Sequence, residues 1–301
     1  MLDYNLLDKL LHQLFLGNIF IKETCFELEK YFFLNNCEDF TLNNHIFISG
    51  MPRAGSTVLL NFIYSSNNFA SLTYKDMPFL MSPNLLSFLK TKKNFKKKRF
   101  HNDYISINTM SPEALDQAFL ATFSKKELSK NYKDYINLIL NNYKRKRYIS
   151  KNNNLLNNLN MIEEDFKNSD ILILLRDPIQ QSNSLLNKHI QFTNMQKENN
   201  FILKYMNFLG HHEFGLGHKS WFLSKKYDNK NSIDYWLEQW LLYFENILSL
   251  LGKNNRISFI DYEKLCTNKI YQMETSEKFN FKYFDPHLKY PKNKDVKFDD
   301  K

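Results

Sequence analysis

The sequence contains only three cysteines and no long apolar run. The spacing of Cys25, Cys37 and Cys266 fits no metal-binding template, so we expect free thiols in a reducing compartment. No run of about 18 uninterrupted apolar residues occurs, so no membrane span is predicted. Residues 1–33 lack a basic start and a small-residue cleavage site, and charges interrupt their apolar positions. They are therefore predicted to form amphipathic helix rather than a signal peptide.

Glycine is also scarce, with 7 among 301 residues, whereas basic residues are in excess. Lys and Arg number 41 against 32 Asp and Glu, which gives a net charge of +9. This balance favours an anionic partner such as a nucleotide, a sulfated or phosphorylated substrate, a nucleic acid or a membrane surface. Much of the charge lies in two runs, at 91–100 and 143–148. We expect the first run to lie in a mobile loop, and a simple solvated basic face is an equal alternative for it.

Short apolar segments alternate with helical patterns along the chain. Strands are expected at 45–49, 146–150, 170–178 and 256–265, and the helices include 56–66, 111–123, 132–143, 154–166, 180–192 and 232–251. Such alternation predicts an α/β fold with a parallel sheet covered by helices on both faces. No repeat or linker interrupts the pattern. We therefore expect one domain over 1–301, with helices in 1–40 and a loose tail at 286–301.

The segment IFISGMPRAGST, residues 46–57, places a glycine-bearing loop between a strand and a helix. Gly50 and Gly55 have the separation of the phosphate-loop template G-x-x-x-x-G-K-[ST], and Thr57 matches its hydroxyl, but Ser56 stands in the lysine position. Backbone amides at a helix start bind anions, and Arg53 adds a fork of donors for an oxyanion. The loop predicts an anion site, with a plain strand-to-helix turn as the alternative. The missing lysine argues against β,γ-phosphate transfer.

A second polar group follows the clearest strand of the sequence. DILILL runs into Arg176, and Ser184 comes eight residues later, about two turns into the next predicted helix. Ligands bind at such strand ends in open α/β sheets. The pair therefore predicts a second phosphate site, although a surface arginine at a helix start is the alternative for Arg176 alone.

These two motifs resemble those of the sulfotransferase superfamily. PRAGST resembles its 5′-phosphosulfate loop and LLRDPIQQSNS its 3′-phosphate motif, and their order and separation match over roughly residues 45 to 265. The resemblance implies a P-loop-NTPase-like, three-layer α/β/α fold. It also implies transfer of a sulfuryl group from 3′-phosphoadenosine 5′-phosphosulfate (PAPS) to an acceptor hydroxyl, with carbohydrate as one option. The segments LTYKDMPF and LGHHEFG resemble a bacterial-type subgroup.

The resemblance also implies roles for matching residues. Lys151 in SKNNN stands where tyrosylprotein-type members carry a strand-end lysine, and it would reach the bridging oxygen, with a surface lysine as the alternative. Arg53 would stabilise charge on the 5′-phosphate. The transferring group carries less charge than a γ-phosphoryl, so no metal is demanded. The predicted nucleotide-binding residues are Arg53, Ala54, Gly55, Ser56, Thr57, Arg176 and Ser184.

Catalysis also needs a general base near the loop. Asp76 in YKDMPF is our prediction, because it lies in the region where tyrosylprotein-type members carry a catalytic glutamate. The match requires a short gap, and Asp76 could equally cap the turn at Pro78. His101 and Asp103 are rivals, since histidine titrates in the useful range.

The segment FLGHHEFGLGH, residues 208–218, contains three histidines and three glycines. His211, His212 and His218 lack the H-E-x-x-H spacing of a zinc site, and no cysteine lies near them. We predict a glycine-hinged acceptor-binding loop here instead of a metal site.

Two other functions remain open from the sequence. A P-loop kinase or NTPase using ATP·Mg²⁺ would use an acidic strand end, and Asp177 follows the strand 170–175. A nucleic-acid-binding protein would use the basic runs, but no nucleic-acid motif is present and the two loops would stay unexplained. PAPS is made in the cytoplasm, so we expect a cytoplasmic enzyme whose partners are the nucleotide donor and an unidentified acceptor.

Overall fold

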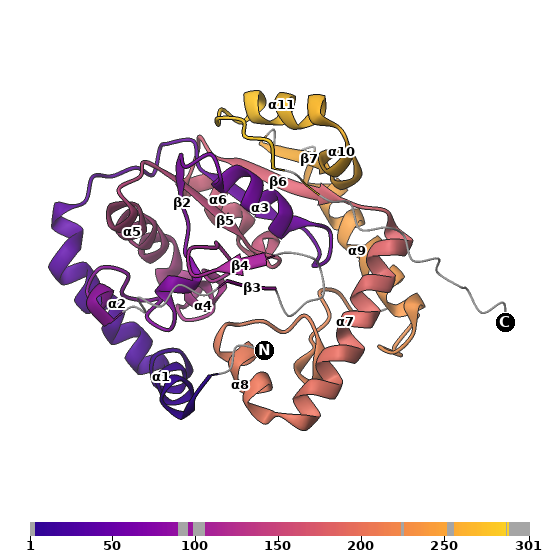
Figure 1. Cartoon of the computed structure of the whole chain (residues 1–301), viewed down its shortest axis with the longest axis horizontal. Helices are drawn as coiled ribbons and strands as arrows, with labels where there is room; N and C mark the ends of the chain where they lie inside the picture. The colour runs from indigo at the N-terminus through magenta and orange to yellow at the C-terminus, as the bar shows by residue number, and fades with distance from the viewer. Residues whose placement is uncertain are drawn as a thin grey trace.

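The computed structural model describes residues 4–89, 96–98, 106–223, 226–251, 256–286 and 288, with the backbone alone at 96–98 and 106. Five parallel strands form the central sheet in the order β2-β5-β1-β6-β7 (Figure 1). Their bounds are β1 Ile46–Ser49, β2 Phe69–Ala70, β5 Arg147–Lys151, β6 Asp170–Leu175 and β7 Ile257–Asp261. The α/β fold with a parallel sheet is confirmed.

Helices cover both faces of the sheet, because successive side chains of a strand point to opposite sides. In β1, Phe47 joins one buried cluster and Ile48 joins the other. The Phe47 cluster includes residues of α1 Leu6–Gly17, α2 Ile19–Phe33, α5 Lys125–Tyr143, α6 Leu159–Asp165, α7 Pro178–Glu198, α8 Asn200–Phe208 and α9 Ile233–Leu251. The Ile48 cluster includes residues of α3 Ser56–Tyr64 and α10 Tyr262–Thr267, and Tyr271 of α11 Lys269–Lys278 packs against it. The result is the predicted three-layer α/β/α arrangement.

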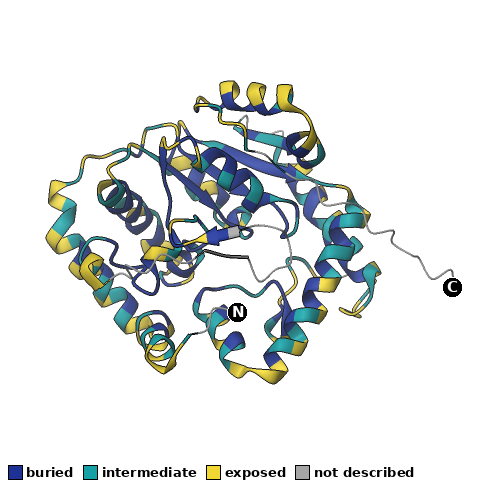
Figure 2. Cartoon of the chain, in the orientation of Figure 1, coloured by how far each residue is buried: buried dark blue, intermediate teal, exposed yellow. Residues whose placement is uncertain are grey.

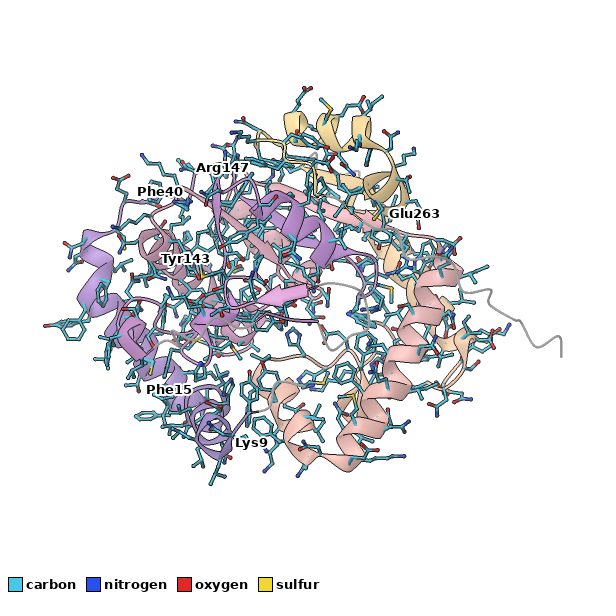
Figure 3. All side chains as sticks on the ribbon, viewed as in Figure 1. Lys9, Phe15, Phe40, Tyr143, Arg147 and Glu263 are labelled. Atoms are coloured by element: carbon cyan, nitrogen blue, oxygen red, sulfur yellow. The ribbon has the colours of Figure 1, made fainter. Side chains whose placement is uncertain are left out.

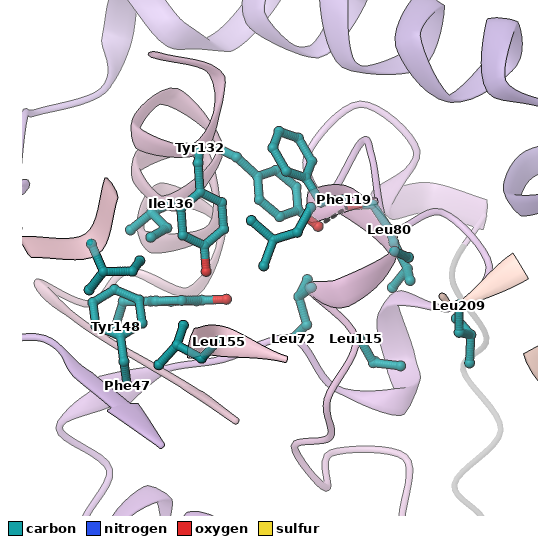
Figure 4. Packing of buried hydrophobic residues seen from close by; sticks show 14 of the residues in the cluster. Phe47, Leu72, Leu80, Leu115, Phe119, Tyr132, Ile136, Tyr148, Leu155 and Leu209 are labelled. Atoms are coloured by element: carbon teal, nitrogen blue, oxygen red, sulfur yellow. Dashed lines mark hydrogen bonds between the residues drawn. The ribbon is translucent and has the colours of Figure 1, made fainter. Parts of the chain in front are cut away.

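The larger cluster is rich in aromatic side chains. The strands are buried while the outer faces of the helices are exposed (Figure 2). Phe119 and Tyr135 stack with ring centroids 3.9 Å apart, and Figure 4 shows Phe119 and Tyr132 packed among the aliphatic side chains of this cluster. Two buried phenols keep a polar partner, since the hydroxyl of Tyr132 donates to Asp116 at 2.9 Å and that of Tyr135 to the carbonyl of Leu80 at 2.7 Å. Apolar rings and satisfied hydroxyls together stabilise this layer.

The helix predicted over 111–123 is wrong in its first half, since α4 covers only Gln117–Leu120. The backbone N–H of Glu113 donates to the carbonyl of Leu72 at 3.3 Å, and Pro112 forms a β-bridge with Thr73. The segment thus pairs with a distant part of the chain instead of starting a helix. This pairing places the Glu113 side chain near the sheet edge described below.

Two predicted loose segments fall largely outside the described residues. Of the run 91–100, only the backbone of β3 Lys96–Lys98 is described, and it pairs antiparallel with β4 Ser106–Asn108. Of the tail 286–301, only 286 and 288 are described. Within the described ranges, none of the helices has the length and apolar character needed to cross a membrane.

Candidate active site

The glycine loop turns the chain from the end of β1 into α3. Gly50 and Gly55 have φ values of 141° and 101°, and Arg53 has a φ of 70°. Gly55 is the N-cap residue of α3 and supplies no side-chain oxygen to the first turn. The amide donors and the positive end of the helix dipole at Ser56 and Thr57 thus face the loop, which favours an anion there.

Tyr262 fills the space under the loop and explains why residue 55 is a glycine. A Cβ atom on Gly55 would lie 2.2 Å from Cδ2 of the Tyr262 ring. The guanidinium of Arg176 lies over the same ring, with its carbon 5.1 Å from the centroid. Tyr262 therefore supports both predicted phosphate motifs at once.

The two motifs are in direct contact. The Nε–H of Arg53 donates to Ser184 Oγ at 3.0 Å, and Nη1 of Arg176 donates to the carbonyl of Arg53 at 2.7 Å. The Nε of Arg176 is buried without a hydrogen-bond partner among the described residues. A phosphate oxygen would satisfy this donor, so the residues present fit a second phosphate group.

Gln181 is a site residue that the sequence reasoning missed. Its Nε2 donates to the carbonyls of Met51 and Pro52 at 3.2 and 3.1 Å, and its Oε1 accepts from Trp240 Nε1 at 3.1 Å. Gln181 thus fixes the loop to α7, the helix that carries Ser184. The available signal was position, because Gln181 and Ser184 are three residues apart and share a helix face.

Lys151 ends β5 and lies beside the start of α3. Its ammonium donates to Thr57 Oγ1 at 3.1 Å and pairs with Glu113 Oε1 at 3.2 Å. The lysine is 7% exposed, and the parallel pairing of β5 with β1 sets Lys151 opposite Ile48 at the carboxyl edge of the sheet. Three groups from distant parts of the chain therefore meet at one point beside the loop.

Glu113 is the second site residue missing from the sequence prediction. Its Oε2 accepts from the hydroxyl of Tyr74 at 3.2 Å while Oε1 contacts Lys151. The sequence reasoning assigned Glu113 to the first turn of a helix, and the strand-like pairing of its backbone overrides that assignment. A carboxylate adjoining Lys151 can accept a proton from a bound hydroxyl.

Asp76 occupies a different part of the structure. Its Oδ2 accepts from the backbone N–H of Thr73 at 2.8 Å and from the hydroxyl of Tyr143 at 2.5 Å. It also lines a cavity of about 320 Å³ with Tyr64, at the far end of α3, and Arg145, before β5 begins. Its role as base stays a prediction.

The rival bases His101 and Asp103 lie outside the described residues.

The histidines of the segment 208–218 make separate contacts and do not converge on one point. His211 contacts Glu213 Oε1 through Nδ1 at 3.3 Å and the carbonyl of Ala114 through Nε2 at 3.1 Å, whereas His218 lies between the carbonyl of Glu213 and the hydroxyl of Tyr235. Among the described residues, no group of three or more His, Cys, Asp or Glu side chains is arranged to hold a metal.

The pKa values of this loop follow from burial and pairing. Burial lowers the pKa of His218 to about 4. Burial opposes the charged forms of Glu213 and His211, but their mutual attraction outweighs it, lowering the pKa of Glu213 to about 2 and raising that of His211. His211 and Glu213 therefore form an ion pair in which the carboxylate is buried and the imidazole is partly buried.

The basic run 143–148 has structural partners. Arg147, labelled in Figure 3, donates to the carbonyls of Asn44, Phe279 and Asn280 and lies 4.3 Å from the centroid of the Phe69 ring. These contacts join β5 to the segment that precedes β1 and to the segment that follows α11. The arginine is thus already used within the fold, which weakens the case for a nucleic-acid surface at this run.

Comparisons with known proteins find one matching family model and several solved structures of similar fold. The family model described as the Sulfotransferase family matches residues 45–275, more than half of the chain. Sulfotransferase STF1 from Mycobacterium tuberculosis H37Rv superposes with a TM-score of 0.52 at 13% identity, covering 94% of this chain and 80% of the mycobacterial one. Sulfotransferase STF9 from Mycobacterium avium superposes with a TM-score of 0.47 at 11% identity, covering 88% and 70%. No match was found among curated protein sequences.

Proposed function

Because the chain belongs to the sulfotransferase family, we propose that it transfers a sulfuryl group from PAPS to an acceptor hydroxyl by in-line displacement. We propose further that no metal takes part, that the enzyme acts in the cytoplasm where PAPS is made, and that the whole chain is one domain. The last point is supported by Leu16 and Phe26 of the N-terminal helices, which share a buried cluster with Ile171 of β6.

The contact between Arg53 and Ser184 carries this proposal. It joins the loop expected to hold the 5′-phosphosulfate to the helix expected to hold the 3′-phosphate. PAPS carries both groups on one ribose, and its 5′-phosphate is the leaving group. Arg176, with its buried and unpartnered Nε, would bind the 3′-phosphate together with Ser184. The amides of Ala54 to Thr57 and the side chain of Arg53 would hold the 5′ group.

We assign charge stabilisation to Lys151 at the end of β5 and proton removal to Glu113 beside it. Lys151 would donate to the oxygen that gains charge as the sulfuryl group leaves, since its ammonium lies 3.1 Å from Thr57 Oγ1 at the helix start. Glu113, in contact with that ammonium, would accept the acceptor's proton. These contacts favour Glu113 over Asp76 as the base, because the Asp76 carboxylate already accepts hydrogen bonds from the N–H of Thr73 and the hydroxyl of Tyr143.

The kinase alternative requires a carboxylate for Mg²⁺. Asp177 was the candidate, but its side chain is the N-cap of α7 and accepts from the backbone N–H of Gln180 at 2.8 Å. This use disfavours a metal role for Asp177.

A metal-free calorimetric titration with adenosine 3′,5′-bisphosphate, with ATP·Mg²⁺ in parallel, tests the proposed function. We expect tight binding of the bisphosphate and weak binding of ATP·Mg²⁺. The reverse preference would mean that the loop is a degenerate NTPase site and that Arg176 and Ser184 do not bind a 3′-phosphate.

A further inference from the structure

A second cavity, of about 310 Å³, is bordered by the segment that follows Lys151. Side-chain amides and aromatic rings form much of its wall, among them Gln117, Asn153, Asn154, Trp221, Phe222 and Tyr243. Its volume is at the small end of the range for small-molecule sites, about 300–1,000 Å³. None of these residues was assigned to the nucleotide or to proton transfer.

Deeply buried polar groups on this wall are left with unused hydrogen-bonding capacity. Asn153 Oδ1 has no hydrogen-bond partner among the described residues, although Asn153 is only 8% exposed. The hydroxyl of Tyr243, which is 1% exposed, lies beside the hydroxyl of Ser49, and one bond between the two leaves one of their O–H donors unused. Buried polar groups in native proteins are nearly always satisfied, so Asn153 Oδ1 and this hydroxyl pair indicate a ligand with hydroxyl groups.

The charges of the wall are largely neutralised. Glu213 lines the cavity, but it is engaged by His211 at 3.3 Å and by Asn153 Nδ2 at 3.1 Å. Lys219 also lines the cavity and is exposed. The other polar groups of the wall are side-chain amides and the hydroxyls of Ser220 and Tyr243, and such neutral donors and acceptors match hydroxyl groups better than a charged ligand.

The cavity is tied to the reaction centre through the backbone after β5. The N–H of Asn152 donates to the carbonyl of Ile48, and its side chain donates to Gln117 Oε1 at 2.7 Å. Asn152 and Asn153 directly follow Lys151 in the sequence. The amide wall of the cavity therefore begins two residues after Lys151, the residue assigned to charge stabilisation.

We propose that this cavity binds the acceptor and that the acceptor is a sugar unit, one hydroxyl of which receives the sulfuryl group. This inference rests on the proposed function. Hydroxyls of the sugar would satisfy Asn153 Oδ1 and Tyr243 OH, and Trp221 with Phe222 would contact its apolar faces. A tyrosine side chain would offer the cavity a single hydroxyl, whereas a sugar unit offers several.

Saturation-transfer NMR with the full chain tests this inference, with adenosine 3′,5′-bisphosphate present at saturation. The probes are methyl β-glucoside, methyl β-galactoside and N-acetylglucosamine, with N-acetyl-tyrosine amide in parallel. We expect at least one glycoside to bind. Asn154→Leu, which replaces an amide of the wall by an apolar side chain of similar size, and Asn153→Ala should each weaken that binding about five- to tenfold.

Asn142→Leu is the matched control, because Asn142 is an amide that lines the other cavity, and it should leave glycoside binding unchanged. Bisphosphate binding, measured separately by calorimetry, should stay within about twofold in all three variants. If the bisphosphate binds but only the tyrosine amide binds with it, or if Asn154→Leu and Asn153→Ala bind glycosides like the wild type, the sugar assignment is overturned while the proposed function stands. Failure of the bisphosphate itself would overturn both.

Discussion

Arg53 donates its Nε–H to Ser184 Oγ at 3.0 Å, which joins two residues 131 positions apart in the sequence. The contact explains how two short motifs form one site. Arg176 completes it by donating to the carbonyl of Arg53. Because each residue positions the next, loss of one should disturb the binding of both phosphate groups.

Arg53→Ala and Arg176→Ala should each weaken adenosine 3′,5′-bisphosphate binding by about 10- to 100-fold, the value of a charge-assisted hydrogen bond. Ser184→Ala should weaken bisphosphate binding only about fivefold, because it removes a neutral hydrogen-bond partner. Calorimetry measures all three. Arg145→Ala is the matched control, since the Arg145 guanidinium contacts Asn67 at 2.5 Å outside this site. Wild-type affinity in both Arg53→Ala and Arg176→Ala would refute the shared site.

Gly55→Ala should lower the free energy of unfolding by about 1–3 kcal/mol and also weaken nucleotide binding. The added Cβ would lie 2.2 Å from the Tyr262 ring, at a φ of +101° that strains any side chain. Gly217→Ala should cost much less, because its nearest neighbour is the flexible Leu203 Cδ1 at 3.2 Å. Urea unfolding compares the two variants. Equal losses of unfolding free energy would show that the Tyr262 ring can move aside without destabilising the fold.

Glu113→Gln should lower kcat about 10²- to 10⁴-fold, the usual contribution of a general base, with bisphosphate binding retained. Asp76→Asn should instead lower stability, since it alters the cap that joins Thr73 and Tyr143, while kcat changes little. Single-turnover kinetics with a glycoside acceptor and urea unfolding separate the two effects. A folded Asp76→Asn enzyme without turnover, beside an active Glu113→Gln enzyme, would return the role of base to Asp76.

The sheet and its two loops could be predicted from the sequence, because the signals are local. DILILL is a continuous apolar run that became β6, and the glycine spacing of the loop fixed the turn before α3. Contacts between distant segments could not be predicted in the same way. Glu113 carries a strong helix-start signal, yet it pairs with Leu72 through its backbone and with Lys151 through its side chain.

The same limit applies to Asp76 and Gln181. Asp76 was predicted as the base because it lies in the region where tyrosylprotein-type members carry a catalytic glutamate, and its contacts with Thr73 and Tyr143 could not be read from that position in the sequence. Gln181 lies in the predicted helix 180–192 and had no predicted role, whereas it is fully buried against the loop carbonyls. The contacts of both residues depend on how α7 and the segment 71–76 pack on the sheet, and no local sequence pattern predicts that packing.

The ion pair of His211 and Glu213 predicts a pH window for stability. The Glu213 pKa of about 2 lies below its unfolded value of about 4.3, so its contribution is present above that value and is lost as the pH falls toward 2. The His211 pKa is raised, so its contribution is full below about 6.5 and is lost as the pH rises through the folded value. The pair should therefore stabilise the fold most between about pH 4.5 and 6.5.

Glu213→Gln removes the charge on one side of this pair and tests that window. At pH 5.5 it should lower the free energy of unfolding by about 3 kcal/mol, because His211 would be left charged and partly buried without its partner. The loss should shrink toward pH 9, because His211 loses its charge as the pH rises through its raised pKa, and also at pH 3, where the wild-type pair itself weakens. Urea unfolding of both proteins at the three pH values gives the comparison. A loss that is equal at all three would mean that Glu213 acts through its hydrogen bond from Asn153 Nδ2 alone.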